Sequence, residues 1–320
     1  GNNRRSPSRR AIASGASFTM IGSFLDFNEN PILMPGSGFD SKAVYNPAVI
    51  VDGGEFHMLY RAESGDPCTG RIGYARSKDG IHFTRHPDPV IVPEHGYEAC
   101  GCEDPRLIKI DDTYYLTYVG NCGRYGWGWA TNICLATSKD LMHWEKHGAI
   151  LMLPKDWARG QMKAGAILPE RINERYVMYF MGEKEPWKPA IGLAYSDDLI
   201  NWDEPLSEPV LLPRKGYFDS KGVEPGTNPL VTEEGIFMVY SGWGEDCVYK
   251  PGGVVFSKDD PGKLLQRMGK PLFEPAQDWG EKFGSANHVV AESLVKHGGS
   301  WLLYYGAADR ACCLAIWEER

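Results

Sequence analysis

The chain has 320 residues, of which 42% are hydrophobic and 24% are charged, proportions that are ordinary for a folded soluble protein. Its formal net charge of −8 argues against a basic surface for phosphate backbones, so we expect no nucleic-acid partner. No run approaches the about 20 apolar residues that a membrane-spanning helix needs, so no membrane span is expected.

The eight cysteines include no CxxC pair, and this argues against a zinc site. In a chain of this length they do not indicate a disulfide framework, and we expect most of them to be buried free thiols. No other motif implies a metal or an organic cofactor. The oligomeric state stays open, a homo-oligomer included.

The first 20 residues are basic and polar and are expected to form a flexible N-terminal segment. The sequence starts with Gly rather than Met, as it would after removal of a signal peptide, which favours a periplasmic or secreted protein. The free thiols favour the cytoplasm as the alternative. Residues 21–320 are expected to form one domain.

A repeat runs through those residues. The motif "IGYARSKDGIHF" begins at Ile72, and related stretches follow whose shared serines are spaced by 61, 58 and 61 residues, at Ser77, Ser138, Ser196 and Ser257. A degenerate fifth copy, "CCLAIW", closes the chain. The SKD triplets are interpreted as turns, and the tryptophans that follow two copies, Trp144 and Trp202, as packing residues.

Three further sets of short segments keep the same phase, so each unit of about 60 residues predicts four antiparallel strands. In chain order, each unit has a first strand, an aromatic strand after a turn, the SKD strand and a run that ends in proline. The first strands are expected at 46–51, 103–110, 163–170, 224–231 and 287–295. Five such sheets predict an all-β, five-bladed β-propeller, with the N-terminal run "NPILMP" completing the last blade.

The first strand of each blade lines the central channel of a propeller, so polar residues at its start face one shared cavity. Asp104, in the sequence "CEDPRL", holds this place in blade 2. Its expected counterparts in the other blades are Asn46, Lys163, Glu224, Asn287, His288 and Glu292. Buried polar groups are costly without partners, so their recurrence indicates a site. A local ion-pair network of Glu103, Asp104 and Arg106 is the alternative.

The segments "CEDPRL", "ATSKDLMHW", "KAGAILPERI" and "YYGAAD" resemble glycoside hydrolase family 130, over about residues 30–317. That family contains β-mannoside phosphorylases and some β-1,2-mannosidases on five-bladed propellers. The resemblance implies that Asp104 is the general acid of an inverting reaction. It also implies sugar contacts by Asn46, Arg61, Lys163 and Asp309.

The sequence departs from the phosphorylase pattern where phosphate is usually bound. Met181 stands where a basic residue is usual, Ser241 replaces a histidine, and two carboxylates, Glu224 and Glu292, take the place of small residues. Phosphate needs cationic partners, whereas a water nucleophile needs a carboxylate that accepts its proton. We therefore expect hydrolysis of β-linked, and more narrowly β-1,2-linked, manno-oligosaccharides, with Glu224 as the base and Glu292 as a second candidate.

The acid role requires that Asp104 keep its proton, so we expect burial and nearby carboxylates to raise its pKa. Arg106 is expected to pair with Glu103 or with a neighbouring blade rather than with Asp104. His288 could contact the nucleophile or satisfy a backbone group. In the loop 121–132, Tyr125, Trp127 and Trp129 are expected to stack on sugar rings or to pack between blades, and Trp187 and Trp243 occupy similar loops.

Three alternatives to hydrolysis are kept. A β-mannoside phosphorylase could hold phosphate as its co-substrate through Arg159, Lys163 and His288. A non-catalytic carbohydrate-binding propeller would bind the same sugars without turnover. An arabinan- or fructan-cleaving propeller would need a carboxylate in the first blade, where Asn46 stands instead.

Overall fold

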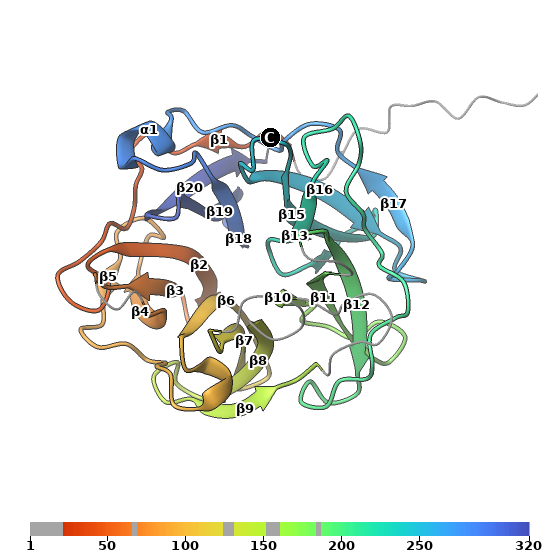
Figure 1. The fold of residues 1–320 in the computed structure, drawn as a ribbon, viewed down its shortest axis with the longest axis horizontal. Coiled ribbons are helices and arrows are strands. Elements are labelled where there is room, and N and C mark those ends of the chain that lie inside the picture. Colours follow the sequence, from red (N-terminus) through yellow and green to blue (C-terminus); the bar gives the residue numbers. More distant parts are fainter. Residues whose placement is uncertain (1–21, 66–68, 124–130, 152–160, 184–186, 320) are drawn as a thin grey trace, which may run out of the picture.

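The computed structural model describes residues 22–65, 69–123, 131–151, 161–183 and 187–319. They form five antiparallel sheets arranged in a ring, the predicted five-bladed β-propeller (Figure 1). No helix in these ranges is long and apolar enough to cross a membrane.

Blades 1 and 2 each contain four strands, ordered from the channel outward. Blade 1 comprises β2 (Ala43–Asp52), β3 (Glu55–Glu63), β4 (Arg71–Ser77) and β5 (Thr84–Arg85). Blade 2 comprises β6 (Gly101–Ile110), β7 (Thr113–Asn121), β8 (Thr131–Ser138) and β9 (Glu145–Ala149). A single 3₁₀ turn, η1 (Gly96–Glu98), precedes blade 2.

Blades 3 to 5 repeat this order with local changes. Blade 3 comprises β10 (Met162–Ile167), β11 (Tyr176–Glu183) and β12 (Pro189–Ser196). Blade 4 comprises β13 (Gly222–Pro225), β14 (Leu230–Val231), β15 (Ile236–Trp243), β16 (Lys250–Phe256) and β17 (Leu264–Arg267). Blade 5 comprises β18 (Val289–His297), β19 (Ser300–Ala307), β20 (Ala311–Glu318) and β1 (Leu25–Asp26), with the helix α1 (Trp279–Phe283) between blades 4 and 5.

The N-terminal strand closes the ring, as predicted. β1 pairs antiparallel with β20, so the first and last described strands share one sheet. Leu33, in the predicted run, adds an isolated bridge to Cys312 of β20. The outer edge of blade 5 is thereby paired over part of its length, which limits an exposed strand edge.

The outermost strands begin earlier than the proline-ended runs suggested. β5 and β17 end before the runs 88–93 and 270–275 begin. The runs contribute single bridges instead, Ile91 to Ile72 and Leu211 to Ile191. Proline cannot donate a ladder hydrogen bond, so a run with proline near both ends supports a bridge better than a strand.

The predicted roles of the SKD turns and the cysteines can be followed in detail. Ser77 and Asp79 accept hydrogen bonds from backbone N–H groups of the turn that follows them, and the copies at Ser138 and Ser196 repeat these bonds. The indole of Trp144 donates to the Leu141 carbonyl and packs on a core cluster. Of the seven cysteines in the described ranges, four are buried and all are free: Cys102, Cys134, Cys312 and Cys313 are the buried ones.

The hydrophobic core is divided among the five seams between blades. One cluster joins blades 1 and 2 through Leu59 and Leu116, and another joins blades 4 and 5 through Phe237 and Trp301. The remaining three clusters fill the other seams. Each blade thus buries both faces against its neighbours, as a closed ring requires.

A buried tyrosine–acid cluster recurs near the outside of the channel in three blades. The acid lies three residues before the first strand, at Asp40, Glu98 and Asp219. Each acid accepts a hydrogen bond from a tyrosine of the aromatic strand and pairs with a cation of the outermost strand. The partners are Tyr60 and Arg85 for Asp40, Tyr118 and Lys146 for Glu98, and Tyr240 and Arg267 for Asp219. These clusters tie the start of a blade to its outer edge.

Four of the five first strands contain a register shift where they reach the cavity. The shifts follow Tyr45, Glu103, Lys163 and Ala291. At three of them the next residue has a left-handed backbone, with φ of 50° at Asn46, 49° at Asp104 and 60° at Ala164. A bulge redirects the side chain that it carries, so this shared irregularity aims Asn46 and Asp104 at the channel.

We predict that Asp219→Ala lowers the free energy of unfolding by about 3–5 kcal/mol, because it leaves two partly buried arginines without their buried counter-charge. Asp219 is fully buried and pairs with both Arg214 and Arg267 at 2.9 and 2.8 Å. Urea denaturation measures the change. The matched control is Asp203→Ala, which removes a solvent-exposed pair with Arg175 and should cost about 0–1 kcal/mol. Equal losses would contradict the cluster's role.

Candidate active site

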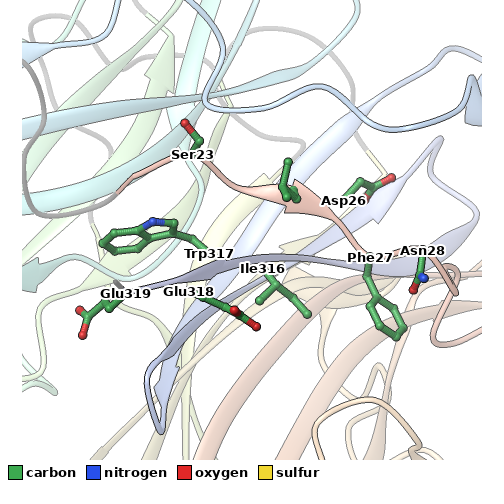
Figure 2. A pocket seen from close by; sticks show the side chains of 9 residues that line it. Ser23, Asp26, Phe27, Asn28, Ile316, Trp317, Glu318 and Glu319 are labelled. Atoms are coloured by element: carbon green, nitrogen blue, oxygen red, sulfur yellow. The ribbon is translucent and has the colours of Figure 1, made fainter.

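A cavity of about 230 Å³ lies at the centre of the ring and is lined by all five blades. Its lining residues are Tyr45, Asn46, Arg61, Asp104, Lys163, Glu224, Tyr249, His288, Val290 and Asp309. The structure therefore brings together seven of the residues singled out from the sequence. A larger cavity of about 790 Å³ lies at the outer edge of blade 5, lined by residues in and beside the paired strands β1 and β20 (Figure 2). It holds Asp26 and Trp317 and none of those seven residues.

Arg61, on β3, is the partner of Asp104. Its Nη1 lies 2.8 Å from Asp104 Oδ1, and its Nη2 lies 2.9 Å from Glu63 Oε1 and 3.5 Å from Glu103 Oε1. The Tyr45 hydroxyl donates to Glu63 at 2.6 Å, and the guanidinium lies 4.7 Å from the centre of the Tyr45 ring. One cation thus faces three carboxylates and an aromatic ring, which fixes its position.

The expected rise in the pKa of Asp104 is wrong. Burial does raise the pKa, but attraction by Arg61, Lys163 and Arg106 outweighs it, so the pKa lies below its ordinary value. Asp104 is therefore ionised in the ligand-free pocket. The sequence signal for this was Arg61, which had been assigned to the sugar.

Arg106 does not pair with Glu103 or with an adjacent blade, contrary to expectation. It is buried and crosses the channel, donating to the carbonyls of Pro225 and Gly226 in blade 4 at 2.8 and 2.9 Å. Its Nη2 also lies 3.6 Å from Glu292 Oε2 in blade 5. Arg106 thereby joins blade 2 to the two blades on the far side of the ring.

Glu292 lies among buried groups near the channel and does not line the cavity. It is fully buried, and Asn46 Nδ2 donates to its Oε2 at 3.1 Å. Burial raises the pKa of Glu292 to about 8, with Asp104 and Glu224 adding to the effect and Arg106 opposing it. Near neutral pH this carboxyl is thus mostly uncharged. It reaches the cavity through Asn46 rather than by direct contact.

Glu224 and Lys163 face the cavity from blades 4 and 3. Burial raises the pKa of Glu224, and Asp104 and Asp309 add to the rise while Lys163 opposes it. For Lys163, burial lowers the pKa, but attraction by Glu224 and Asp104 outweighs this and keeps the amine charged. Glu224 Oε2 is buried and has no hydrogen-bond partner among the described residues.

His288 and Asp309 complete the wall contributed by blade 5. The Tyr249 backbone N–H donates to His288 Nδ1 at 3.1 Å, so the remaining ring nitrogen, Nε2, carries the proton of the neutral form. Burial raises the pKa of Asp309, and His288 opposes the rise. His288 thus satisfies a backbone group, one of its two expected roles, while still lining the cavity.

The remaining predicted residues fall outside the cavity or outside the described ranges. Glu103 contacts Arg61 and accepts from Asn121, behind the cavity wall. Asn287 accepts from the Trp279 backbone N–H and holds the start of α1. Trp187 is 79% exposed. Tyr125, Trp127, Trp129 and Arg159 lie outside the described residues.

Sequence reasoning missed three lining residues, Tyr45, Tyr249 and Val290. Tyr45 directly precedes Asn46, and the register shift brings both into the cavity. Tyr249 comes from the hairpin between β15 and β16, where no repeat marks it. In the described part of the chain no group of three or more His, Cys, Asp or Glu side chains is arranged to hold a metal ion.

Comparisons with known proteins agree on one family. A family model of glycoside hydrolase family 130, described as β-1,4-mannooligosaccharide phosphorylase, matches residues 28–320. A 1,2-β-oligomannan phosphorylase of Thermoanaerobacter sp. (strain X514) is 37% identical, over 92% of this chain and 96% of its own. A β-1,2-mannobiose phosphorylase of the same organism is 34% identical, over 91% and 96%.

A solved structure adds a relative whose description concerns hydrolysis. Its description states that the GH130 family of mannoside phosphorylases contains glycoside hydrolases that target β-1,2 mannosidic linkages in Candida mannan. It matches with a TM-score of 0.81 and 27% identity, over 95% of this chain and 96% of that chain. The two Thermoanaerobacter relatives are thus named as phosphorylases, whereas the description of this structure also refers to glycoside hydrolases.

We predict that Glu292→Gln gains stability relative to the wild type as the pH rises from 5 to 8. The folded pKa of about 8 lies above the ordinary value of 4.5, so between them only the folded state holds the proton, and wild-type stability falls with pH. Glutamine cannot ionise and escapes this loss.

Urea denaturation at pH 5 and pH 8 measures the effect, with Glu145→Gln, at an exposed position, as the control. A difference from the wild type that is the same at both pH values would show that Glu292 is ionised throughout and would contradict the prediction.

Proposed function

Because the chain belongs to glycoside hydrolase family 130, we propose that it is a β-mannoside phosphorylase acting on β-1,2-linked manno-oligosaccharides. The observation that carries this proposal is the convergence of Asp104, Arg61, Lys163 and His288 in one cavity at the centre of the ring. The names of the two Thermoanaerobacter relatives support both the linkage and the use of phosphate. Phosphorolysis, the alternative in the sequence analysis, is thus better supported than the hydrolysis expected there.

The sequence argued against phosphate because two ionised carboxylates, Glu224 and Glu292, would repel a dianion. This argument is weaker in the folded protein. Burial raises the pKa of each, that of Glu292 to about 8, so their combined negative charge near neutral pH is smaller than the sequence suggests. Lys163 stays charged and offers phosphate a cationic partner.

The chemistry follows from these groups. Phosphate oxygen attacks the anomeric carbon, the bond from that carbon to the glycosidic oxygen breaks, and the departing sugar oxygen takes a proton. Asp104 is the proposed source of that proton, through a mannose hydroxyl. Although Asp104 is ionised in the ligand-free pocket, a bound dianion and the exclusion of water both raise its pKa. Binding of the two substrates therefore favours protonation of Asp104, which can then act as the acid.

Hydrolysis is the second candidate, and one observation favours it. Glu224 lines the cavity, and its buried Oε2 has no hydrogen-bond partner among the described residues. A carboxylate in that position can accept the proton of an attacking water. The same carboxyl has a raised pKa, so this role requires that it lose its proton when substrate binds.

Incubation of the protein with β-1,2-mannobiose, with and without phosphate, separates the two. We expect mannose 1-phosphate and mannose in equal amounts, formed only when phosphate is present. Free mannose alone, formed at the same rate without phosphate, would overturn phosphorolysis in favour of hydrolysis. Tight binding of the sugar without any turnover under either condition would overturn both in favour of a carbohydrate-binding protein.

We further predict that Asp104→Asn lowers kcat by about 10²–10⁴-fold, the usual contribution of a general acid. Asparagine preserves the size of the side chain and a hydrogen bond to substrate, so the KM for the sugar should change much less. Steady-state assays with mannobiose and phosphate measure both constants. The control is Asp112→Asn, at an exposed turn, which should match the wild type. A variant at Asp104 with wild-type kcat would refute the assignment.

A further inference from the structure

Two tyrosines line the cavity, and their hydroxyl groups differ in one respect. The Tyr45 hydroxyl is engaged, since it donates to Glu63 at 2.6 Å. Tyr249 also lines the cavity, and its hydroxyl has no hydrogen-bond partner among the described residues. Burial raises its pKa, and Glu224, Asp309 and Asp104 add to the rise. Tyr249 therefore presents an O–H group to a cavity whose walls carry hydrogen-bond acceptors.

The ring of Tyr249 is held in place on two sides. It stacks on Trp243, with ring centres 4.1 Å apart and planes only 3° from parallel. The edge of His288 lies against it, with ring centres 5.1 Å apart. Such aromatic contacts fix the ring's plane and leave the hydroxyl free to serve a ligand.

The backbone of Tyr249 is fixed to the next blade. Its N–H donates to His288 Nδ1 at 3.1 Å, and its carbonyl accepts from the Val289 N–H at 2.9 Å. The hairpin of blade 4 is thereby joined to the first strand of blade 5. A loop residue tied at both backbone groups is positioned almost as well as one in a strand, as a binding site requires.

Trp243 can support Tyr249 only because Gly222 has no side chain. A Cβ atom built on Gly222 would lie 2.1 Å from the Trp243 ring, well inside contact distance. Gly222 begins β13, two residues before Glu224. The glycine at the start of β13 therefore makes room for the aromatic stack beside Glu224, which lines the cavity.

We propose that Tyr249 is a specificity-determining residue whose hydroxyl donates a hydrogen bond to one hydroxyl of the bound mannosyl unit. A sugar hydroxyl can accept from Tyr249 and donate to a wall carboxylate at the same time, which matches a phenol placed among acceptors. The raised pKa keeps the phenol protonated, so it remains a donor across the working pH range. The inference rests on the proposed function, because it presumes a mannoside in the cavity.

Tyr249→Phe tests the inference, since it removes the hydroxyl and keeps the ring. We expect the dissociation constant for β-1,2-mannobiose, measured by calorimetry, to rise about five- to tenfold, the value of one neutral hydrogen bond. In turnover assays KM should rise by a similar factor with kcat nearly unchanged, because the bond is present in both ground and transition states. The control is Tyr217→Phe, at a half-exposed tyrosine outside the cavity lining.

Monodeoxy mannosides identify the hydroxyl that Tyr249 contacts. The wild type should bind one analogue markedly more weakly than the parent sugar, because the missing hydroxyl leaves Tyr249 unpaired. The Tyr249→Phe variant should bind that analogue and the parent sugar with nearly equal affinity, because neither ligand can make the contact. If Tyr249 had only a structural role, its replacement would lower the affinity for the parent sugar and for every analogue by the same factor.

The outcomes separate this inference from the proposed function. If the wild type binds mannobiose and Tyr249→Phe binds it equally well, the assignment of Tyr249 is overturned while the proposed function stands. If the wild type binds no manno-oligosaccharide, both are overturned. If Tyr249→Phe weakens binding and erases discrimination against one deoxy sugar, the assignment is supported.

Discussion

Burial of opposite charges around one axis is the constraint on which this propeller depends. Ionised groups are costly to remove from water, so each one near the channel needs a partner from another strand or blade. Arg61 meets this need for Asp104, and Arg106 reaches blades 4 and 5. At Glu292, burial outweighs the attraction of Arg106 and the hydrogen bond from Asn46, so the pKa rises. The ring and its site are therefore held by the same contacts.

The channel residues that the strand pattern positions could be predicted from the sequence. The repeat fixed the phase of the strands, and the start of each first strand then gave Asn46, Asp104, Lys163 and Glu224 as channel residues. Those positions depend only on the strand pattern. Tyr249 does not, because it lies in a hairpin whose path is set by His288 in the next blade.

The protonation of the site was the least predictable property. The residue types near Asp104 include both carboxylates and cations, and their net effect depends on distances that sequence does not contain. Attraction by Arg61, which lies 2.8 Å away, together with Lys163 and Arg106, lowers the pKa of Asp104 against the expected direction. The same limit applies to Glu292, whose burial and whose contacts with Asn46 and Arg106 depend on distances that the sequence does not contain.

The bulges in the first strands have a consequence for how such enzymes diversify. A register shift separates two parts of a first strand. Side chains on its cavity side can contact a ligand, while the regular alternation on its other side continues to pack between blades. Replacement of a residue on the cavity side of such a shift, such as Lys163, can then alter the chemistry without disturbing the packing between blades. One scaffold is thereby free to exchange one reaction partner for another over evolutionary time.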